Sequence, residues 1–294
     1  MLRRLSYVFL CVVPFLVSVL AGARPLRISP VYQIVGAVLS AAIVLAAWLV
    51  GARVVRTGPE LRREQALAGT LLLVPFMLVS LLWIGLGPPW EATPMENRMR
   101  YLVLVLNSIA ISGGLVVLWD SLREAGERLY STLGFAANML AGAAYIIWMS
   151  FALGVSVVKA RTGQTAPAIV AIRDVHDSLL FIACVLTYLA TAAFAASLGR
   201  AGWLSRAASR AYVIVSFVAL MFIMVRGLSF PDPTAGSMPW YMSPGFIAGI
   251  PAVPWIMPSL LGVILLRRAG DASVATTAGS EDHLQAAAKS HSTV

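Results

Sequence analysis

The stretch that decides the fold is Asp174-Val-His-Asp-Ser-Leu-Leu-Phe-Ile-Ala-Cys-Val-Leu-Thr-Tyr-Leu-Ala-Thr-Ala-Ala-Phe-Ala-Ala-Ser-Leu198. From Ser178 onward it is apolar and long enough to cross a bilayer as a helix, the form in which lipid leaves no backbone group unpaired. Its first residues include His176, the only histidine outside the C-terminal tail, which lies between Asp174 and Asp177. The stretch therefore predicts a membrane-spanning helix with a charged, titratable end.

The composition of the whole chain is typical of a membrane protein. Of its 294 residues, 59% are hydrophobic and only 12% are charged, and the mean hydropathy is +0.83. About eight apolar segments of spanning length follow one another. They are expected near Leu5–Ala21, Val31–Val50, Leu67–Leu86, Tyr101–Trp119, Leu133–Val157, Ser178–Leu198, Ala211–Arg226 and Phe246–Leu266. The sequence thus predicts an all-α, polytopic transmembrane helix bundle over residues 1–268.

The two ends of the chain need separate interpretations. Met1-Leu-Arg-Arg4 is a basic start, and the apolar run after it ends in Ala21-Gly-Ala23, which resembles a signal-peptidase site. A retained first helix is the favoured interpretation, and cleavage would leave about seven spans with the same orientation. Residues 269–294 are rich in Ala, Ser and Thr and are predicted to form a disordered cytoplasmic tail.

The placement of basic residues predicts the orientation of the bundle. Lys and Arg accumulate on the cytoplasmic side of membrane proteins. With the N-terminus inside, cytoplasmic segments hold about fourteen of the 22 basic residues. Both termini are therefore predicted to be cytoplasmic, in a bacterial-type inner membrane. The net charge of +9 reflects the same bias, so no nucleic-acid partner is expected.

Small residues within the spans predict close helix packing. Gly134, Asn138 and Gly142 recur at four-residue spacing, which lets helix backbones approach one another. Cys11 and Cys184 are both expected within the bilayer, and their spacing indicates neither a disulfide nor a metal site. We interpret the two cysteines as small apolar packing residues.

Several chemistries are disfavoured by the motifs that the sequence lacks. It has no phosphate-binding glycine loop, no His-Glu-x-x-His and no Gly-x-Ser-x-Gly. A single histidine in the membrane region excludes bis-histidine haem ligation. No carboxylate is expected near the bilayer midplane, which argues against an ion-coupled carrier. The sequence therefore predicts no cofactor and favours a protein that is not an enzyme.

The predicted topology gathers charged side chains at the extracytoplasmic end. They are Glu91, Glu96, Asp174, His176, Asp177, Arg226 and Asp232. Carboxylates with an imidazole suit a divalent cation of unknown identity, whereas Arg226 suits an anionic headgroup or solute. A structural interpretation is also open: Asp174 caps the helix with Asp177 in its first turn, Arg226 pairs with a carboxylate, and the glutamates are solvated loop charges.

Two functions fit these observations. The favoured one is a non-catalytic sensory, assembly or structural membrane component. Its partners would be the lipid bilayer and either a membrane protein or a second copy of the chain. The alternative is a transporter or a solute- or lipid-binding protein, with a cavity open to the extracytoplasmic face and a small-molecule ligand that is unknown. Proline residues in the last span, at Pro251, Pro254 and Pro258, favour a broken helix of the kind that carriers use.

Overall fold

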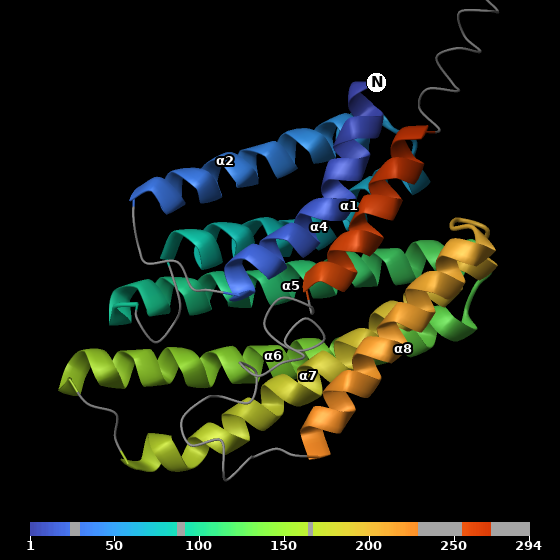
Figure 1. Cartoon of the computed structure of the whole chain (residues 1–294). Helices are drawn as coiled ribbons and strands as arrows, with labels where there is room; N and C mark the ends of the chain where they lie inside the picture. The colour runs from blue at the N-terminus through green and yellow to red at the C-terminus, as the bar shows by residue number, and fades with distance from the viewer. Residues whose placement is uncertain (24–29, 87–91, 164–166, 229–254, 272–294) are drawn as a thin grey trace, which may run out of the picture.

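The computed structural model describes residues 1–23, 30–86, 92–163, 167–228 and 255–271 (Figure 1). All elements within these ranges are helical. They are α1 (Leu2–Ala23), α2 (Pro30–Ala47), the π-helix η1 (Trp48–Ala52), α3 (Val54–Thr57), α4 (Glu60–Leu86), α5 (Pro94–Glu124), α6 (Leu129–Thr162), α7 (Pro167–Arg200), α8 (Arg206–Leu228) and a last helix at residues 255–271. The all-α prediction is confirmed.

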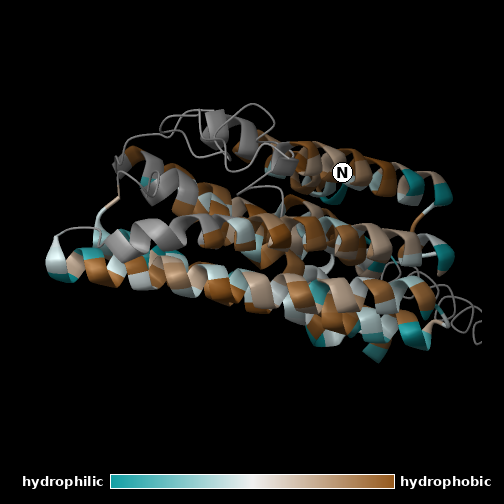
Figure 2. Ribbon diagram, turned by 90° about the horizontal axis from the view of Figure 1, so that it is seen from below, coloured by the Kyte–Doolittle hydropathy of each residue, from teal (hydrophilic) through white to brown (hydrophobic). Residues whose placement is uncertain are grey.

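Six of the described helices are long and apolar enough to cross a membrane. They cover Gln33–Thr57, Glu60–Leu82, Pro94–Glu124, Leu129–Thr162, Ser178–Arg200 and Arg206–Val225. Figure 2 shows apolar residues mainly along the middle of the helices and hydrophilic residues gathered at their ends. These helices indicate a membrane protein. The total of eight spans stays a prediction, and so does the retention of the first span as an uncleaved helix.

Helices that follow one another in the chain lie side by side. The chain runs back and forth from α4 to α8, with α5 between α4 and α6, and with α6 packed most extensively on α7 (Figure 1). The short turns between them force neighbouring helices to be antiparallel. Each turn therefore falls at one of two opposite ends of the bundle.

One of these ends carries most of the described arginines, and we call it the basic end. There the N-terminus meets the end of the last helix, because Arg3 forms an ion pair with Asp271 at 3.0 Å and donates to the Val50 carbonyl at 3.1 Å. Arg267 stacks over Tyr7, with its Cζ 4.6 Å from the ring centroid. The hydrogen bond from Arg267 to Tyr7, with help from Asp271, raises the pKa of this guanidinium. Both described ends of the chain thus lie on the same side of the bundle.

Most residues of the last helix are buried, and they pack against helices on both sides of it. Trp255, Met257, Leu261 and Leu265 belong to the core built by α4 to α8. Other residues of the same helix join the core between α1, α2 and α4; they are Val263, Leu266 and Ala269. A helix that is apolar all round is expected in such a position. The last helix therefore contributes side chains to both cores and lies between them (Figure 1).

Glycine residues allow the last helix to approach its neighbours. A Cβ atom on Gly262 would lie 2.7 Å from the carbonyl oxygen of Gly69 in α4, and one on Gly69 would lie 2.8 Å from the carbonyl oxygen of Gly262. Gly51 and Gly270 make a similar contact between the last helix and η1, against the carbonyl oxygens of Leu266 and Val50. Bare backbone at these crossings gives the close packing on which helix association in lipid depends.

The small residues of α6 have the packing role that the sequence predicted. A Cβ on Gly134 would lie 2.9 Å from the ring of Phe194 in α7, and one on Gly142 would lie 2.6 Å from the hydroxyl of Ser112 in α5. Asn138, between them, is buried. The face of α6 that carries these residues therefore contacts both neighbouring helices.

Several predicted boundaries are wrong because helices continue past the apolar core. The expected connection at residues 159–173 is helical on both sides of residues 164–166, since α6 reaches Thr162 and α7 begins at Pro167. Proline suits the first position of a helix, where no backbone donor is needed. Asp174 therefore lies inside α7, and the interpretation of Asp174 as its cap is wrong. The loop expected at 51–65 contains η1, α3 and the start of α4.

The last helix continues into the first residues of the predicted tail. Residues 269–271 complete the last helix, and Ala269 is fully buried. Residues 272–294 lie outside the described part of the chain, as do the expected proline-broken start of the last span at Pro251 and Pro254.

We expect Gly262→Ala to destabilise the bundle, because its Cβ meets backbone that cannot rotate away. Overpacking of this kind costs about 1–3 kcal/mol of unfolding free energy. The matched control is Gly154→Ala in α6, where nothing lies within 4 Å of an added Cβ. That change should be neutral or slightly stabilising. Unfolding in mixed micelles of increasing SDS content measures both, and equal effects would contradict the assigned contact.

Candidate functional site

The charged cluster expected at the extracytoplasmic end is described only in part. The first turns of α5 and α7 and the last turn of α8 share the end opposite the basic end. Their backbones carry Glu96, Asp174, His176, Asp177 and Arg226. Apart from Glu96, the side chains of these residues lie outside the described part of the structure, as do Glu91 and Asp232 entirely. A joint binding site at this end stays a prediction.

Glu96 has a structural task. Its Oε2 accepts hydrogen bonds from the backbone nitrogen and the hydroxyl of Thr93, each at 2.7 Å, and the Glu96 nitrogen donates to the Thr93 hydroxyl at 3.3 Å. This reciprocal pair is a capping box that begins α5. The motif Thr93-Pro-Met-Glu96 has the spacing of a capping box, so the sequence contains a signal for this role. Glu96 is thus engaged with its own helix.

Arg100, which the sequence analysis did not single out, is a buried cation at the same end. Its side chain is 1% exposed, and its Nη1 donates to Oδ1 of Asn97 at 2.8 Å. One turn later on α5, Leu104 is also buried, and so is Asn107. A spacing of three to four residues places them on one helix face, so helical periodicity was the signal that could have found Arg100.

Polar side chains from three helices converge in the middle of the bundle. They surround a cavity of about 10 Å³, to which α5 contributes Ser108 and Ser112, α6 contributes Asn138 and Tyr145, and α7 contributes Thr187. Trp255 of the last helix also lines it. A space of this size suits about one water molecule with polar neighbours. The cavity is therefore about the size of one water molecule, and its lining includes both polar and apolar residues.

Hydrogen bonds across this cavity connect the helices. Asn138 donates to the Ser112 carbonyl at 3.5 Å, and the hydroxyl of Tyr145 lies 3.4 Å from the sulfur of Cys184. Among described residues, the hydroxyl of Ser108 has no hydrogen-bond partner. A single water molecule in the cavity would satisfy it. Cys184, expected as a packing residue, is fully buried and a free thiol.

Two further hydrogen bonds fix α4 and the last helix to their neighbours. Asn107 donates from α5 to the carbonyl oxygen of Pro75 in α4 at 3.4 Å. The Tyr212 hydroxyl of α8 donates to the Met257 carbonyl at 2.6 Å, in the first turn of the last helix. Both acceptors are backbone carbonyl oxygens, so each bond joins a side chain of one helix to the backbone of another. The polar core thus serves helix contacts.

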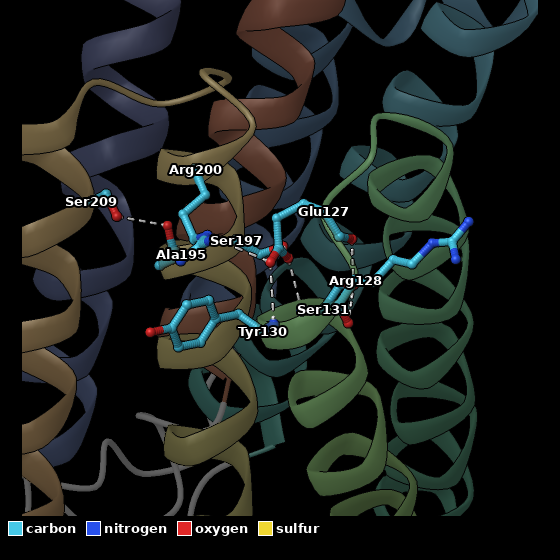
Figure 3. A network of polar contacts seen from close by, with 8 residues as sticks. All are labelled: Glu127, Arg128, Tyr130, Ser131, Ala195, Ser197, Arg200 and Ser209. Carbon is cyan, nitrogen blue, oxygen red and sulfur yellow. Dashed lines mark hydrogen bonds and ion pairs between the residues drawn. The ribbon is translucent and has the colours of Figure 1, made fainter.

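A second polar network lies at the basic end, around the buried carboxylate of Glu127 (Figure 3). Glu127 is 7% exposed and accepts from the backbone nitrogens of Tyr130 at 3.3 Å and Ser131 at 3.1 Å, in the first turn of α6. The Ser197 hydroxyl of α7 donates to the same carboxylate, and Arg200 lies 3.8 Å away. A carboxylate at a helix N-terminus is stabilised by the free amides and the helix dipole.

The network continues to α8 through Ser209. Its hydroxyl donates to the carbonyl of Ala195 in α7 at 2.8 Å, and Gly199 leaves the space for this close approach. The Glu127 network therefore links the α5–α6 turn and the ends of α6 and α7, while Ser209 joins α8 to them. We call this arrangement the Glu127 clamp. Nothing in the spacing of the charged residues between Glu124 and Arg128 predicted the burial of Glu127.

The described side chains contain no group of three His, Cys, Asp or Glu residues that could hold a metal ion. The geometry of the polar core and of the Glu127 clamp suits hydrogen bonding between helices. No known protein family, curated protein or solved structure was found to match this chain.

Removing the Glu127 carboxylate should weaken the bundle. In Glu127→Ala the amides of Tyr130 and Ser131 and the Ser197 hydroxyl lose a charged acceptor while they remain buried, which costs about 2–3 kcal/mol of unfolding free energy. The control is Arg128→Ala, because Arg128 is exposed and points away from the clamp (Figure 3). Surface changes of this kind stay within about 0.5 kcal/mol. Equal stability of the two variants would show that the clamp contributes nothing.

Proposed function

We propose that this protein is a multi-pass integral membrane component with a non-catalytic role, in sensing, assembly or structural support of the membrane. The observation that carries the proposal is the set of contacts that the polar side chains make in the middle of the bundle. Asn138 and Tyr145 contact polar groups of the neighbouring helices, and the cavity that they line has space for about one water molecule. This packing supports a closed bundle that presents its surface to lipid and partners.

The proposal includes an orientation. Arg3, Arg56, Arg123, Arg200 and Arg267 lie on segments that the structure brings to one end of the bundle. The positive-inside rule supports a cytoplasmic position for this end, in a bacterial-type inner membrane. Both termini would then be cytoplasmic.

Cys184 tests the closed bundle directly, because it is fully buried next to Tyr145, which lines the cavity. In a Cys11→Ala background in liposomes, Cys184 is the only thiol. A small water-soluble methanethiosulfonate should leave it unmodified under conditions that fully modify Glu124→Cys, since Glu124 is exposed. Denaturation in SDS should then make Cys184 reactive, which proves that the thiol was intact.

Rapid modification of Cys184 in the folded protein would contradict this proposal. It would mean that water reaches the middle of the bundle, and it would favour the alternative, a transporter whose cavity opens to the extracytoplasmic face.

The orientation has its own measurement. Green fluorescent protein fused after residue 294 should fluoresce, because it folds in the cytoplasm, and alkaline phosphatase at the same position should be inactive because it needs periplasmic disulfides. The opposite pair of results would place the basic end outside.

A further inference from the structure

A lipid-facing groove runs between α2 and α4, and we call it the α2/α4 groove. It has a volume of about 280 Å³ and is lined mainly by apolar residues that include Val44, Leu67, Val74 and Met77. The two helices pack side by side over their length (Figure 1). Val44 is 53% exposed and Leu67 is 40% exposed, so the groove is open to its surroundings. In a bilayer, these surroundings are acyl chains.

One end of the groove is cationic and aromatic. Trp48 and Arg56 both line it, and the Arg56 Cζ lies 5.4 Å from the centroid of the Trp48 ring. Both side chains are exposed, and within the described ranges no carboxylate pairs with Arg56. Tryptophan favours the boundary between acyl chains and headgroups. The guanidinium of arginine matches the geometry of a phosphate group.

The backbone places this arginine at the groove. The π-helix η1 interrupts the helix at Gly51, whose φ of 178° and ψ of −8° are not helical. The carbonyl of Leu266 in the last helix lies where a side chain of residue 51 would be. The break turns the chain into the short α3, which carries Arg56 in its last turn. π-Helical turns of this kind often occur at functional sites.

Further arginines surround this end. Arg53 and Arg63 are exposed on either side of Arg56, and Arg62 is partly exposed. The start of α4 also carries two carboxylates: Glu60, which is exposed, and Glu64, which accepts a hydrogen bond from Ser121 at 2.8 Å. Clusters of basic residues beside a membrane span attract anionic lipids. An apolar groove that ends in such a cluster is complementary in shape and charge to an anionic phospholipid.

We propose that the α2/α4 groove binds an acyl chain of one anionic phospholipid, whose phosphate is held by Arg56. The lipid belongs to the leaflet at the basic end. Trp48 contributes to both parts of the site, because it lines the groove and its ring lies against the guanidinium. The inference goes beyond the proposed function and requires only that the chain lies in a bilayer. It would survive if Cys184 proved accessible.

Native mass spectrometry of the full chain in a mild detergent tests the proposal. The protein is titrated with dimyristoyl phosphatidylglycerol and, separately, with dimyristoyl phosphatidylcholine. We expect one phosphatidylglycerol to bind at least about fivefold more tightly than phosphatidylcholine, which is the effect of one arginine near an anionic surface. Arg56→Gln should remove this preference, because the net negative charge of phosphatidylglycerol then has no cationic partner at the groove.

A second variant tests the apolar part of the site. Val44→Trp fills the groove from its exposed side and should abolish binding of both lipids. Leu67→Trp, from the opposite wall, should do the same and replaces Val44→Trp if that variant does not fold. The elution volume in detergent reports folding for each variant.

The matched control is Arg123→Gln. Arg123 also stacks on a tryptophan at the basic end, with its Cζ 4.7 Å from the Trp119 ring centroid, but it lines no part of the groove. This variant should bind phosphatidylglycerol as the wild type does. An equal loss in Arg123→Gln, or no loss in Arg56→Gln, would overturn the proposal, because binding would then follow net charge.

Two other occupants give distinct results. If millimolar inorganic phosphate displaces phosphatidylglycerol completely, the site takes a free anion and the proposal is wrong. If the protein is a dimer that Val44→Trp dissociates, with no lipid bound in either form, the groove is an interface between two copies. Retained phosphatidylglycerol in the presence of phosphate, on a chain of unchanged oligomeric state, supports the lipid site.

Discussion

Helices in a bilayer associate through close packing, because the lipid around them is as apolar as their own side chains. In this protein the closest packing lies along the last helix. Gly262 meets Gly69 of α4, and Gly270 meets the π-helix η1 near Gly51. The core of α4 to α8 and the core of α1, α2 and α4 both include residues of this helix. The arrangement of the two cores depends on these backbone contacts.

Polar groups form hydrogen bonds at three levels of the bundle: at each end and in the middle. Thr93 and Glu96 cap α5 at one end, and Asn138 and Tyr145 connect helices in the middle. At the basic end, Glu127 holds α6 and α7 together. An unpaired polar group is costly where no water reaches it. Hydrogen bonds at each level therefore add specificity to a packing that apolar side chains alone leave loosely defined.

The interruption of the helix at Gly51 links the packing of the bundle to its surface. The last helix presses on η1, the chain turns, and Arg56 comes to the end of the α2/α4 groove. The contact that closes the interior thus also shapes a lipid-facing site. A side chain at position 51 would disturb both, since the carbonyl of Leu266 occupies its place.

Part of the site was readable from the sequence. The Thr93-x-x-Glu96 spacing indicates a capping box, and Arg100 falls on the stripe of α5 that also holds Leu104 and Asn107. Glu127 carried no such signal, because a carboxylate in a charged turn is usually solvated. Its burial results from the approach of Ser197, which lies seventy residues away in the chain. The hypothesis that Asp174 caps its helix failed because α7 begins earlier, at Pro167.

The sequence by itself determined that the chain forms apolar helices of spanning length, approximately where six of them lie, and which of the connections between them are basic. These are properties of windows of about twenty residues, and hydropathy and charge decide them locally. Only the tertiary structure decided that the helix at residues 255–271 lies between two cores, that Arg100 and Glu127 are buried, and that Arg56 borders a groove. Each of these depends on which helix lies beside which, and that choice is made by contacts between residues far apart in the chain.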